Sequence, residues 1–190
     1  MEFQARRREV TLRAAAALDR VEGRQGLVAE VTMKKVGLPP VLDQNTEVLI
    51  LGSLPSDISL SRGEYYGNPN NDFWKILSAV LSQPLTTLPY EERRKILLTY
   101  KIGLWDVYHH CVRPGSMDKD ITEMEPNDFG ALRTEAPKLK LVCFNGKEAA
   151  RVEEDARRLG YHTEVLPSSS GANRNNQEER LNCWKNALRP

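Results

Sequence analysis

The sequence has few of the residues that cross-link small proteins or bind metal ions. Its 190 residues include three histidines and three cysteines, Cys111, Cys143 and Cys183. The cysteines lie far apart and form no C-x-x-C pair, which disfavours a zinc finger, an iron–sulfur cluster and a disulfide framework. We therefore expect a protein of a reducing compartment that binds no metal ion and needs no cofactor.

Long hydrophobic runs are also missing. No stretch of 18 apolar residues occurs, so the sequence predicts no segment that spans a bilayer. The N-terminus has no apolar signal core, and Glu2, Glu9 and Asp19 argue against an organelle transit peptide. These absences predict a cytoplasmic protein, of a bacterial-type cytosol or nucleoid, with no membrane partner.

An excess of charge of either sign is missing as well. The chain has 27 Lys and Arg residues against 26 Asp and Glu, a net charge of +1. Residues 1–32 carry six of the basic and five of the acidic residues, so the remaining 158 residues carry 21 of each. Proteins that coat nucleic acid without specificity are usually strongly basic. Any contact with nucleic acid must therefore come from a local patch or from backbone donors.

Short apolar runs alternate with amphipathic segments along the chain. Runs typical of buried strands cover residues 47–51, 102–105, 140–144 and 161–166. Helical patterns cover residues 73–81, 90–100, 147–159 and 176–188. This alternation predicts an α/β fold in which helices cover both faces of a parallel sheet. We expect one domain over residues 33–190, preceded by a peripheral helical extension over residues 1–32.

Small and polar residues follow every predicted strand. Residues 52–56 follow the first strand, Asp106 the second and Asn145 the third. The segment 165–177, at the end of the fourth strand, contains three consecutive serines and no acidic residue. Ligands of an open parallel sheet bind beyond the carboxyl ends of its strands. We therefore expect the functional site on this rim.

Five motifs lie in order along this rim. They are LILGSLPS at 49–56, YYGNPNNDFW at 65–74, GLWDV at 103–107 with RPGSMD at 113–118, FNGKEA at 144–149, and LPSSSGAN at 166–173. Together they resemble the uracil-DNA glycosylase superfamily, most closely its hypoxanthine-DNA glycosylase branch, from about residue 33 onward. The resemblance implies a three-layer α/β/α sandwich with a short, mainly parallel, four-stranded central sheet.

The resemblance also implies a monomeric DNA-repair enzyme that acts on DNA containing a deaminated base. Such an enzyme flips the damaged nucleotide out of the duplex, with hypoxanthine as the first expectation and uracil as the second. It then hydrolyses the N-glycosidic bond with water and leaves an abasic site. Because this cleavage develops oxocarbenium character, catalysis requires a placed water and stabilisation of charge rather than a covalent nucleophile.

Asn71 is the expected catalytic residue. It occupies the position of the Asn on which the hypoxanthine branch relies, whereas Leu54 replaces the water-activating Asp or Asn of better-known branches. A neutral amide can orient water. Asn is also a favoured helix N-cap, so a structural role stays open for Asn71, with Asn70 as an alternative cap.

The base pocket is expected to contain Tyr66, which matches the aromatic residue that stacks under the flipped base. Asp106 stands where other branches read the base, and its carboxylate can accept a hydrogen bond from a ring N–H. Capping of its own loop is the alternative role for Asp106. The resemblance assigns further base contacts to Asn68, Gly52, Ser53 and Leu54.

DNA contacts are expected from the loops after the first and fourth strands, because hydroxyls and backbone amides of such loops donate to phosphate oxygens. The residues concerned are Pro55, Ser56, Pro167, Ser168, Ser169, Ser170, Asn173 and Arg174. Two nearby residues depart from the family's pattern. Leu166 replaces a catalytic His of the uracil enzymes, and Gly171 stands where the hypoxanthine branch commonly has Pro.

Two other functions stay open. A lesion-binding module of the same fold that does not cut DNA is motivated by Leu54 and Leu166, which replace residues of the catalytic machinery in other branches. A small-molecule serine hydrolase is the second of these alternatives, although the chain has no G-x-S-x-G motif.

Overall fold

The central sheet contains four short parallel strands. The computed structural model of the chain describes residues 34–112, 122–173 and 176–188. The strands have the order β3-β2-β6-β7, with the bounds β2 Val48–Gly52, β3 Ile102–Asp106, β6 Leu141–Asn145 and β7 His162–Leu166. The four strands predicted from the apolar runs are confirmed, each within one residue of its expected ends.

The β2 strand is buried on both of its faces. Successive side chains of a strand point to opposite faces, so Ile50 belongs to one hydrophobic core and its neighbours Leu49 and Leu51 to another. The core of Ile50 includes residues of α3 (Phe73–Leu81), α4 (Tyr90–Thr99) and α7 (Gln177–Ala187).

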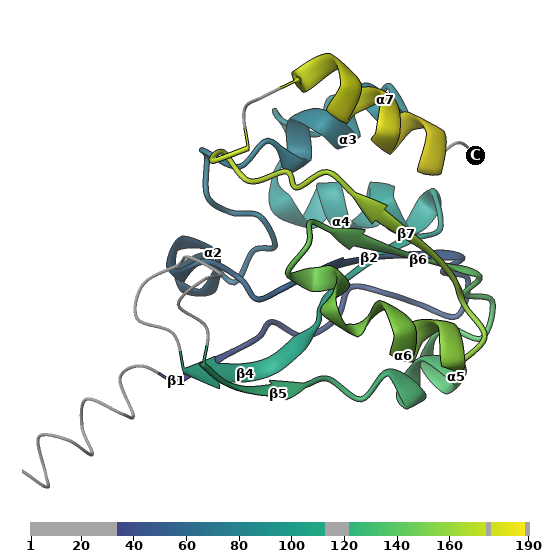
Figure 1. The fold of residues 1–190 in the computed structure, drawn as a ribbon. Helices are drawn as coiled ribbons and strands as arrows, with labels where there is room; N and C mark the ends of the chain where they lie inside the picture. Colours follow the sequence, from purple (N-terminus) through teal and green to yellow (C-terminus); the bar gives the residue numbers. More distant parts are fainter. Residues whose placement is uncertain (1–33, 113–121, 174–175, 189–190) are drawn as a thin grey trace, which may run out of the picture. The chain divides into compact units, whose positions relative to one another are not determined.

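The opposite core covers the other face of the sheet. It includes residues of α5 (Leu132–Glu135), η3 (Ala149–Val152) and α6 (Glu153–Arg158). Figure 1 shows α3, α4 and α7 on one side of the sheet and α5 and α6 on the other. This arrangement is the three-layer α/β/α sandwich that the motifs implied.

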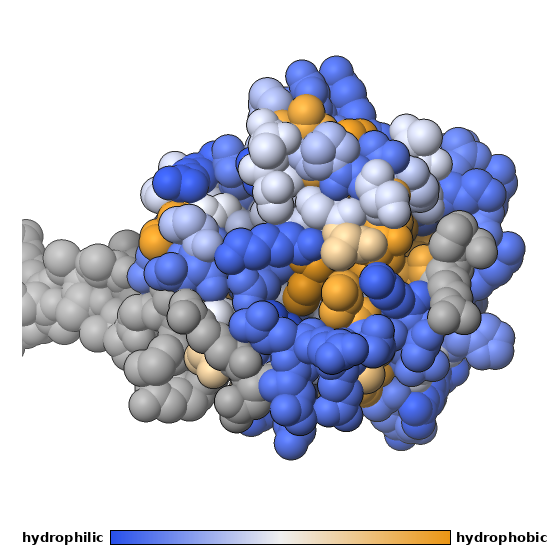
Figure 2. Space-filling model, turned by 90° about the horizontal axis from the view of Figure 1, so that it is seen from above, coloured by the Kyte–Doolittle hydropathy of each residue, from blue (hydrophilic) through white to orange (hydrophobic). Residues whose placement is uncertain are grey.

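Helix α3 places the candidate catalytic Asn71 at the rim of the sheet. Its buried side chains recur at helical spacing, with Phe73, Trp74, Leu77 and Leu81 turned towards the core. Figure 2, which views the molecule from above, shows a mostly hydrophilic surface with one hydrophobic patch near its centre. Burial of the apolar face of α3 fixes the start of the helix at Phe73, and therefore the position of Asn71 two residues before it.

The other predicted helices agree with the structure except in one segment. The bounds of α3, α4 and α7 lie within one residue of those expected. The single helix predicted over residues 147–159 is instead a 3-10 turn, η3, followed by α6. Such tight turns are frequent at the ends of α-helices, and the hydrophobic pattern does not distinguish them from an α-helical turn.

Several short elements were not predicted. They are β1 (Lys34–Val36), α2 (Asp57–Arg62), β4 (Tyr108–Val112), β5 (Thr122–Pro126), η2 (Phe129–Ala131) and α5 (Leu132–Glu135). The β4 and β5 strands pair antiparallel with two register shifts. Their sequences, YHHCV and TEMEP, mix polar and apolar residues without regular alternation. Periodicity therefore gives no strand signal there.

The chain divides into two units, Met1–Lys35 and Val36–Pro190, and the sandwich belongs to the second. Residues 1–32, for which the sequence predicted a helical extension, lie outside the described residues. Among the described residues, no helix is long and apolar enough to cross a membrane.

Candidate active site

A pocket of about 640 Å³ opens at the carboxyl end of the central sheet. Three of its lining residues, Gly52, Asp106 and Asn145, are the last residues of β2, β3 and β6. The others come from loops and, for Ser59, from α2: Ser53, Leu54, Pro55, Ser56, Ser59, Tyr65, Tyr66, Asn68, Asn70, Asn71, Ser168, Ser169, Ser170, Gly171 and Ala172. The pocket therefore lies on the rim where parallel sheets bind their ligands.

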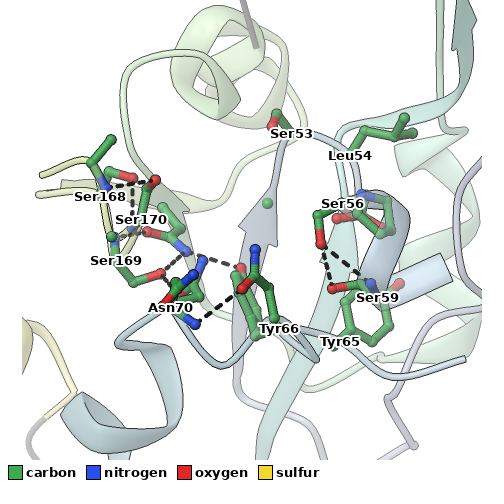
Figure 3. A pocket seen from close by; sticks show the side chains of 18 residues that line it. Ser53, Leu54, Ser56, Ser59, Tyr65, Tyr66, Asn70, Ser168, Ser169 and Ser170 are labelled. Carbon is green, nitrogen blue, oxygen red and sulfur yellow. Dashed lines mark hydrogen bonds between the residues drawn. The ribbon is translucent and has the colours of Figure 1, made fainter. Parts of the chain in front are cut away.

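Two walls face each other across the pocket. The β2 wall consists of residues 52–56 with Ser59 of α2, and the loop wall consists of Asn70, Asn71 and residues 168–172. Figure 3 shows the serines of the loop wall on one side, the serines of the β2 wall on the other, and Tyr66 between them.

Gly52 lets the side chains of Asp106 and Tyr66 approach the end of β2. A Cβ atom at this position would lie 2.9 Å from Oδ1 of Asp106 and 3.2 Å from the hydroxyl of Tyr66. Only a residue without a side chain permits that approach. The sequence predicted base contacts for all three residues, and the structure brings them together.

Asp106 is buried, with 2% of its surface exposed, and it influences a neighbouring tyrosine. Burial and the Asp106 carboxylate raise the pKa of Tyr65 far above its ordinary value of 10.0. The Tyr65 hydroxyl donates a hydrogen bond to the carbonyl of Leu38, at 2.9 Å. Tyr65 therefore stays protonated at neutral pH and cannot act as a base.

Tyr66 has a backbone conformation that is uncommon outside glycine, with φ of 55°. Its ring stacks on Phe73, with the centroids 3.6 Å apart and the planes 12° from parallel. Its hydroxyl accepts a hydrogen bond from Nδ2 of Asn145, at 3.1 Å. Such backbone strain persists only where surrounding contacts hold it, and it concentrates at functional sites.

The side-chain amide of Asn71 has a fixed orientation. Its Oδ1 accepts hydrogen bonds from the backbone N–H of Phe73, at 3.0 Å, and from the hydroxyl of Ser169, at 2.9 Å. A backbone N–H can only donate, so the atom that faces it must be the amide oxygen. Because these two bonds occupy both lone pairs of Oδ1, the group that Asn71 can offer a ligand is its amide NH2 group, Nδ2.

Asn71 therefore bonds the start of α3 while it lines the pocket. The N-cap position itself belongs to Asp72, whose side chain makes no capping hydrogen bond. The Asn70 side chain does not cap the helix, and its backbone N–H donates to Oδ1 of Asn68, at 3.0 Å. The structural and the functional roles considered for Asn71 are thus compatible in one side chain.

Asn145, Ser169 and Asn71 are joined by a series of hydrogen bonds that all run in one direction. The backbone N–H of Ser169 donates to Oδ1 of Asn145 at 2.8 Å, which fixes this second amide. Nδ2 of Asn145 then donates to the Ser169 hydroxyl, also at 2.8 Å. The Ser169 hydroxyl gives its own hydrogen to Asn71, so the donors run from Asn145 through Ser169 to Asn71.

The three serines expected to contact phosphate differ in their surroundings. Ser169 is wholly buried and its hydroxyl is used within the protein. Ser170 is exposed and Ser168 half-buried; their oxygens accept hydrogen bonds from the backbone N–H groups of Ala172 and Ser170. Of these three loop serines, Ser168 and Ser170 keep a hydroxyl hydrogen for phosphate.

Two other predicted DNA contacts lie outside the pocket lining and hold the loop in place. The carbonyl of Pro167 accepts a hydrogen bond from Nε1 of Trp184, at 2.9 Å. Nδ2 of Asn173 donates to the carbonyl of Ser168, at 3.0 Å. Arg174, the remaining residue of this prediction, lies outside the described residues.

The predicted residues of the β2 wall all line the pocket. Ser53, Leu54, Pro55 and Ser56 follow β2 in order, and the hydroxyl of Ser56 accepts a hydrogen bond from the backbone N–H of Ser59 as the N-cap of α2. Leu54 is buried, so it supplies an apolar surface to the β2 wall.

Several lining residues, and one ion pair behind the loop wall, were not predicted from the sequence. Asn145 carried a signal, because it ends a predicted strand within the FNGKEA motif. The pair of Asp72 and Arg180 carried none, since its members lie 108 positions apart. A hydrogen bond from Arg180 lowers the pKa of Asp72, which keeps that carboxylate charged.

The pocket offers amides, hydroxyls and one carboxylate. None of its described lining residues is His, Cys, Lys or Arg, and Asp106 is the one acid among them. In the described part of the chain, no group of three or more His, Cys, Asp or Glu side chains is placed to hold a metal ion. A serine nucleophile in this lining would have no histidine or lysine base beside it.

The chain is similar to proteins of one family. A model of the Uracil DNA glycosylase superfamily matches residues 39–189. A protein named Hypoxanthine DNA glycosylase from Methanosarcina acetivorans is 49% identical over 157 residues, and one of the same name from Methanosarcina barkeri is 47% identical. Each alignment covers 83% of this chain and 99% of the relative.

A solved structure is similar as well. A solution NMR structure of a Methanosarcina acetivorans chain has a TM-score of 0.77 and 49% sequence identity. The alignment covers 83% of this chain and 98% of the solved chain.

Proposed function

Because the chain belongs to the uracil-DNA glycosylase superfamily, we propose that it is a DNA glycosylase that removes hypoxanthine from DNA. Two relatives with 47% and 49% identity bear the name of that activity, and the chain spans 99% of each. The observation that carries the proposal is the pocket at the sheet edge, where Tyr66, Asp106 and Asn71 meet. An aromatic face with polar groups around it is what a flipped base requires.

The base would be held by Tyr66 and Asp106. One face of the Tyr66 ring is covered by Phe73, so the opposite face is the one available to a base. Stacking of this kind contributes about 1–3 kcal/mol per base. The carboxylate of Asp106 can accept a hydrogen bond from the N1–H of hypoxanthine, a contact that the purine retains in its keto form.

The reaction is the hydrolysis of one bond. The oxygen of water bonds to C1′ of the deoxyribose and loses one proton, the C1′–N9 bond breaks with its electron pair going to the base, and the base takes up one proton. Because Oδ1 of Asn71 already accepts two hydrogen bonds, Asn71 serves as a donor to the leaving base, on which negative charge develops. Donors aimed at developing negative charge are a large part of enzymatic rate enhancement.

Contact with the DNA backbone is assigned to the outer part of the loop wall. The hydroxyls of Ser168 and Ser170 can donate to phosphate oxygens. Residues 33–190 carry no net charge, so we expect weak binding to undamaged DNA and a shallow salt dependence. We propose that the enzyme is monomeric and cytosolic; light scattering after gel filtration checks the mass.

A substrate panel tests the function. Duplexes that carry deoxyinosine, deoxyuridine or deoxyxanthosine are incubated with excess enzyme, and abasic sites are cleaved with alkali. We expect product from the deoxyinosine duplex, slower product from deoxyuridine and none from undamaged DNA. Absence of product from all three damaged duplexes would refute the proposal.

One outcome of the same panel favours a second function. The apolar Leu54 in the β2 wall motivates a module that binds lesions without cutting them. Tight binding to the deoxyinosine duplex without any abasic product supports that module, whereas multiple turnover excludes it.

A further inference from the structure

An ion pair lies behind the loop wall, outside the pocket lining. Arg180, in the first turn of α7, has 5% of its surface exposed. Its Nη2 lies 2.7 Å from Oδ2 of Asp72, the residue between Asn71 and the first turn of α3. Arginine is rarely buried unless it is paired, because its charge loses hydration.

The guanidinium of Arg180 also holds both ends of the segment 168–173, which contains the three serines of the loop wall. Its Nη1 donates to the carbonyl of Asn173 at 2.7 Å and to that of Ser168 at 3.4 Å. The planar fork of arginine can make several such contacts at once, which the single ammonium of lysine cannot do in the same geometry. One side chain thereby joins the loop to the start of α3.

Asp72 has a second contact with the same loop. Its backbone N–H donates to the carbonyl of Ser169 at 2.9 Å. The loop and the start of α3 are therefore tied together on both sides of the Ser169–Asn71 hydrogen bond, which measures 2.9 Å. A loop that moved away from Asp72 would remove the hydroxyl that holds Oδ1 of Asn71.

We propose that Arg180 and Asp72 are positioning residues of the glycosylase. Their ion pair holds the loop wall against α3, so that Ser169 keeps the amide NH2 group of Asn71 directed at the substrate. Neither residue lines the pocket, so both act through Asn71 and Ser169. The inference rests on the proposed function, and its test separates the failure of one from the failure of the other.

A double-mutant cycle between Arg180 and Asn71 tests the proposal. Single-turnover excision from the deoxyinosine duplex is measured at saturating enzyme, together with Kd. Arg180→Gln should slow excision by about 100-fold, the effect expected when a catalytic group is misplaced by about 1 Å, while Kd changes much less. In the Asn71→Ala background the same change should have almost no further effect, because the positioned group is already gone.

Conservative variants and a control complete the experiment. Arg180→Lys should recover part of the rate, since lysine can still pair with Asp72. The matched control is Arg158→Gln on α6, which removes an exposed arginine from its pairs with Glu154 and Asp155 and should leave the rate unchanged. If Arg180→Gln does not fold at the assay temperature, Arg180→Lys and Asp72→Asn carry the same cycle.

The outcomes distinguish the two proposals. Losses that multiply in the double variant indicate a structural role for Arg180 and overturn the inference, as does an Arg180→Gln rate equal to that of the wild type. Absence of product from the wild-type enzyme refutes the proposed function instead.

Discussion

The two walls of the pocket are held by different kinds of contact. In the β2 wall, Ser56 bonds Ser59 three residues away, and Gly52 accepts a hydrogen bond from the neighbouring strand end at Val107. In the loop wall, Ser169 bonds Asn71 across 98 positions of the chain. The β2 wall is thus an extension of the sheet, whereas the position of the loop wall depends on a few polar contacts.

This difference predicts how the walls respond to mutation. Changes in the β2 wall should act on the shape of the base site, because its residues are continuous with the hydrophobic core. Changes in the loop wall should act on the orientation of Asn71 while the core stays folded. Kinetics that separate binding from the chemical step can distinguish the two responses.

The largest effect is expected for Asn71→Asp. The carboxylate can still accept from Phe73 and Ser169, but it offers no donor in place of Nδ2. We expect single-turnover excision to fall by about 100- to 1000-fold, as for the loss of one donor at developing charge.

The control for this variant is Asn186→Asp, which adds the same charge on the exposed side of α7 and should leave the rate unchanged. An Asn71→Asp enzyme as fast as the wild type would mean that the oxygen of Asn71, rather than its amine, serves the reaction. In that case the assigned direction of the hydrogen bonds is wrong for the catalytic state.

A large effect is also expected for Gly171→Ala in the loop wall. A Cβ atom there would lie 2.2 Å from the carbonyl oxygen of Asn70, a backbone atom, so the loop must move. We expect about a 100-fold slower chemical step with a cooperative thermal transition retained.

Gly52→Ala provides the contrast in the β2 wall. Its Cβ would press on the side chains of Asp106 and Tyr66, so weaker binding of the flipped nucleotide is expected. Enzyme-titration curves for both variants separate the two effects. Identical kinetic signatures for the two substitutions would remove the distinction between the walls.

An intermediate effect is expected for the serines of the loop wall. Ser169→Ala leaves Oδ1 of Asn71 and Nδ2 of Asn145 without their shared partner, which should lower the free energy of unfolding by about 1–3 kcal/mol and slow excision. Ser170→Ala removes an exposed hydroxyl and should raise Kd only slightly. Denaturant titrations and single-turnover rates are compared, and equal effects of the two variants would contradict the account.

The smallest effect is expected at the other end of β2. Hydrogen bonds from Lys101 and then Lys140 lower the pKa of Glu47 from 4.5 to about 2. A carboxylate with a depressed folded-state pKa stabilises the fold above pH 4.5 and loses that contribution as the pH falls towards 2. Glu47→Gln should therefore reduce stability slightly at pH 7, less at pH 3, and leave excision unchanged.

Urea titrations at several pH values check this prediction. A stability difference between wild type and Glu47→Gln that grows on acidification would contradict the assigned ion pairs. A slower excision rate would show that the two ends of β2 are coupled.

The central sheet and the lining of the β2 wall could be predicted from the sequence. The apolar run at 47–51 is long enough to indicate a strand buried on both faces, and Gly52 marks where it ends. Residues at the strand ends then follow from the geometry of a parallel sheet, so the position of Asp106 at the rim could be predicted. The resemblance added Asn71 and Tyr66, which periodicity alone does not mark.

The hydrogen bonds by which the loop wall holds Asn71 could not be predicted from the sequence. Three adjacent serines look alike in sequence, yet only Ser169 is buried between two asparagines. The partnership of Arg180 with Asp72 depends on how α7 packs beside α3, and a charged residue near a helix start is usually exposed. Contacts of this kind arise only once the core has set the positions of the helices.

The most direct test of the account compares excision of hypoxanthine by the wild type and by Asn71→Ala. Single-turnover rates on a deoxyinosine duplex are measured at saturating enzyme, with thermal melting to confirm that both proteins fold. The account predicts abasic product from the wild type and a rate about 100- to 1000-fold lower for Asn71→Ala with similar melting. Equal rates for the two proteins, or no product from the wild type, would contradict it.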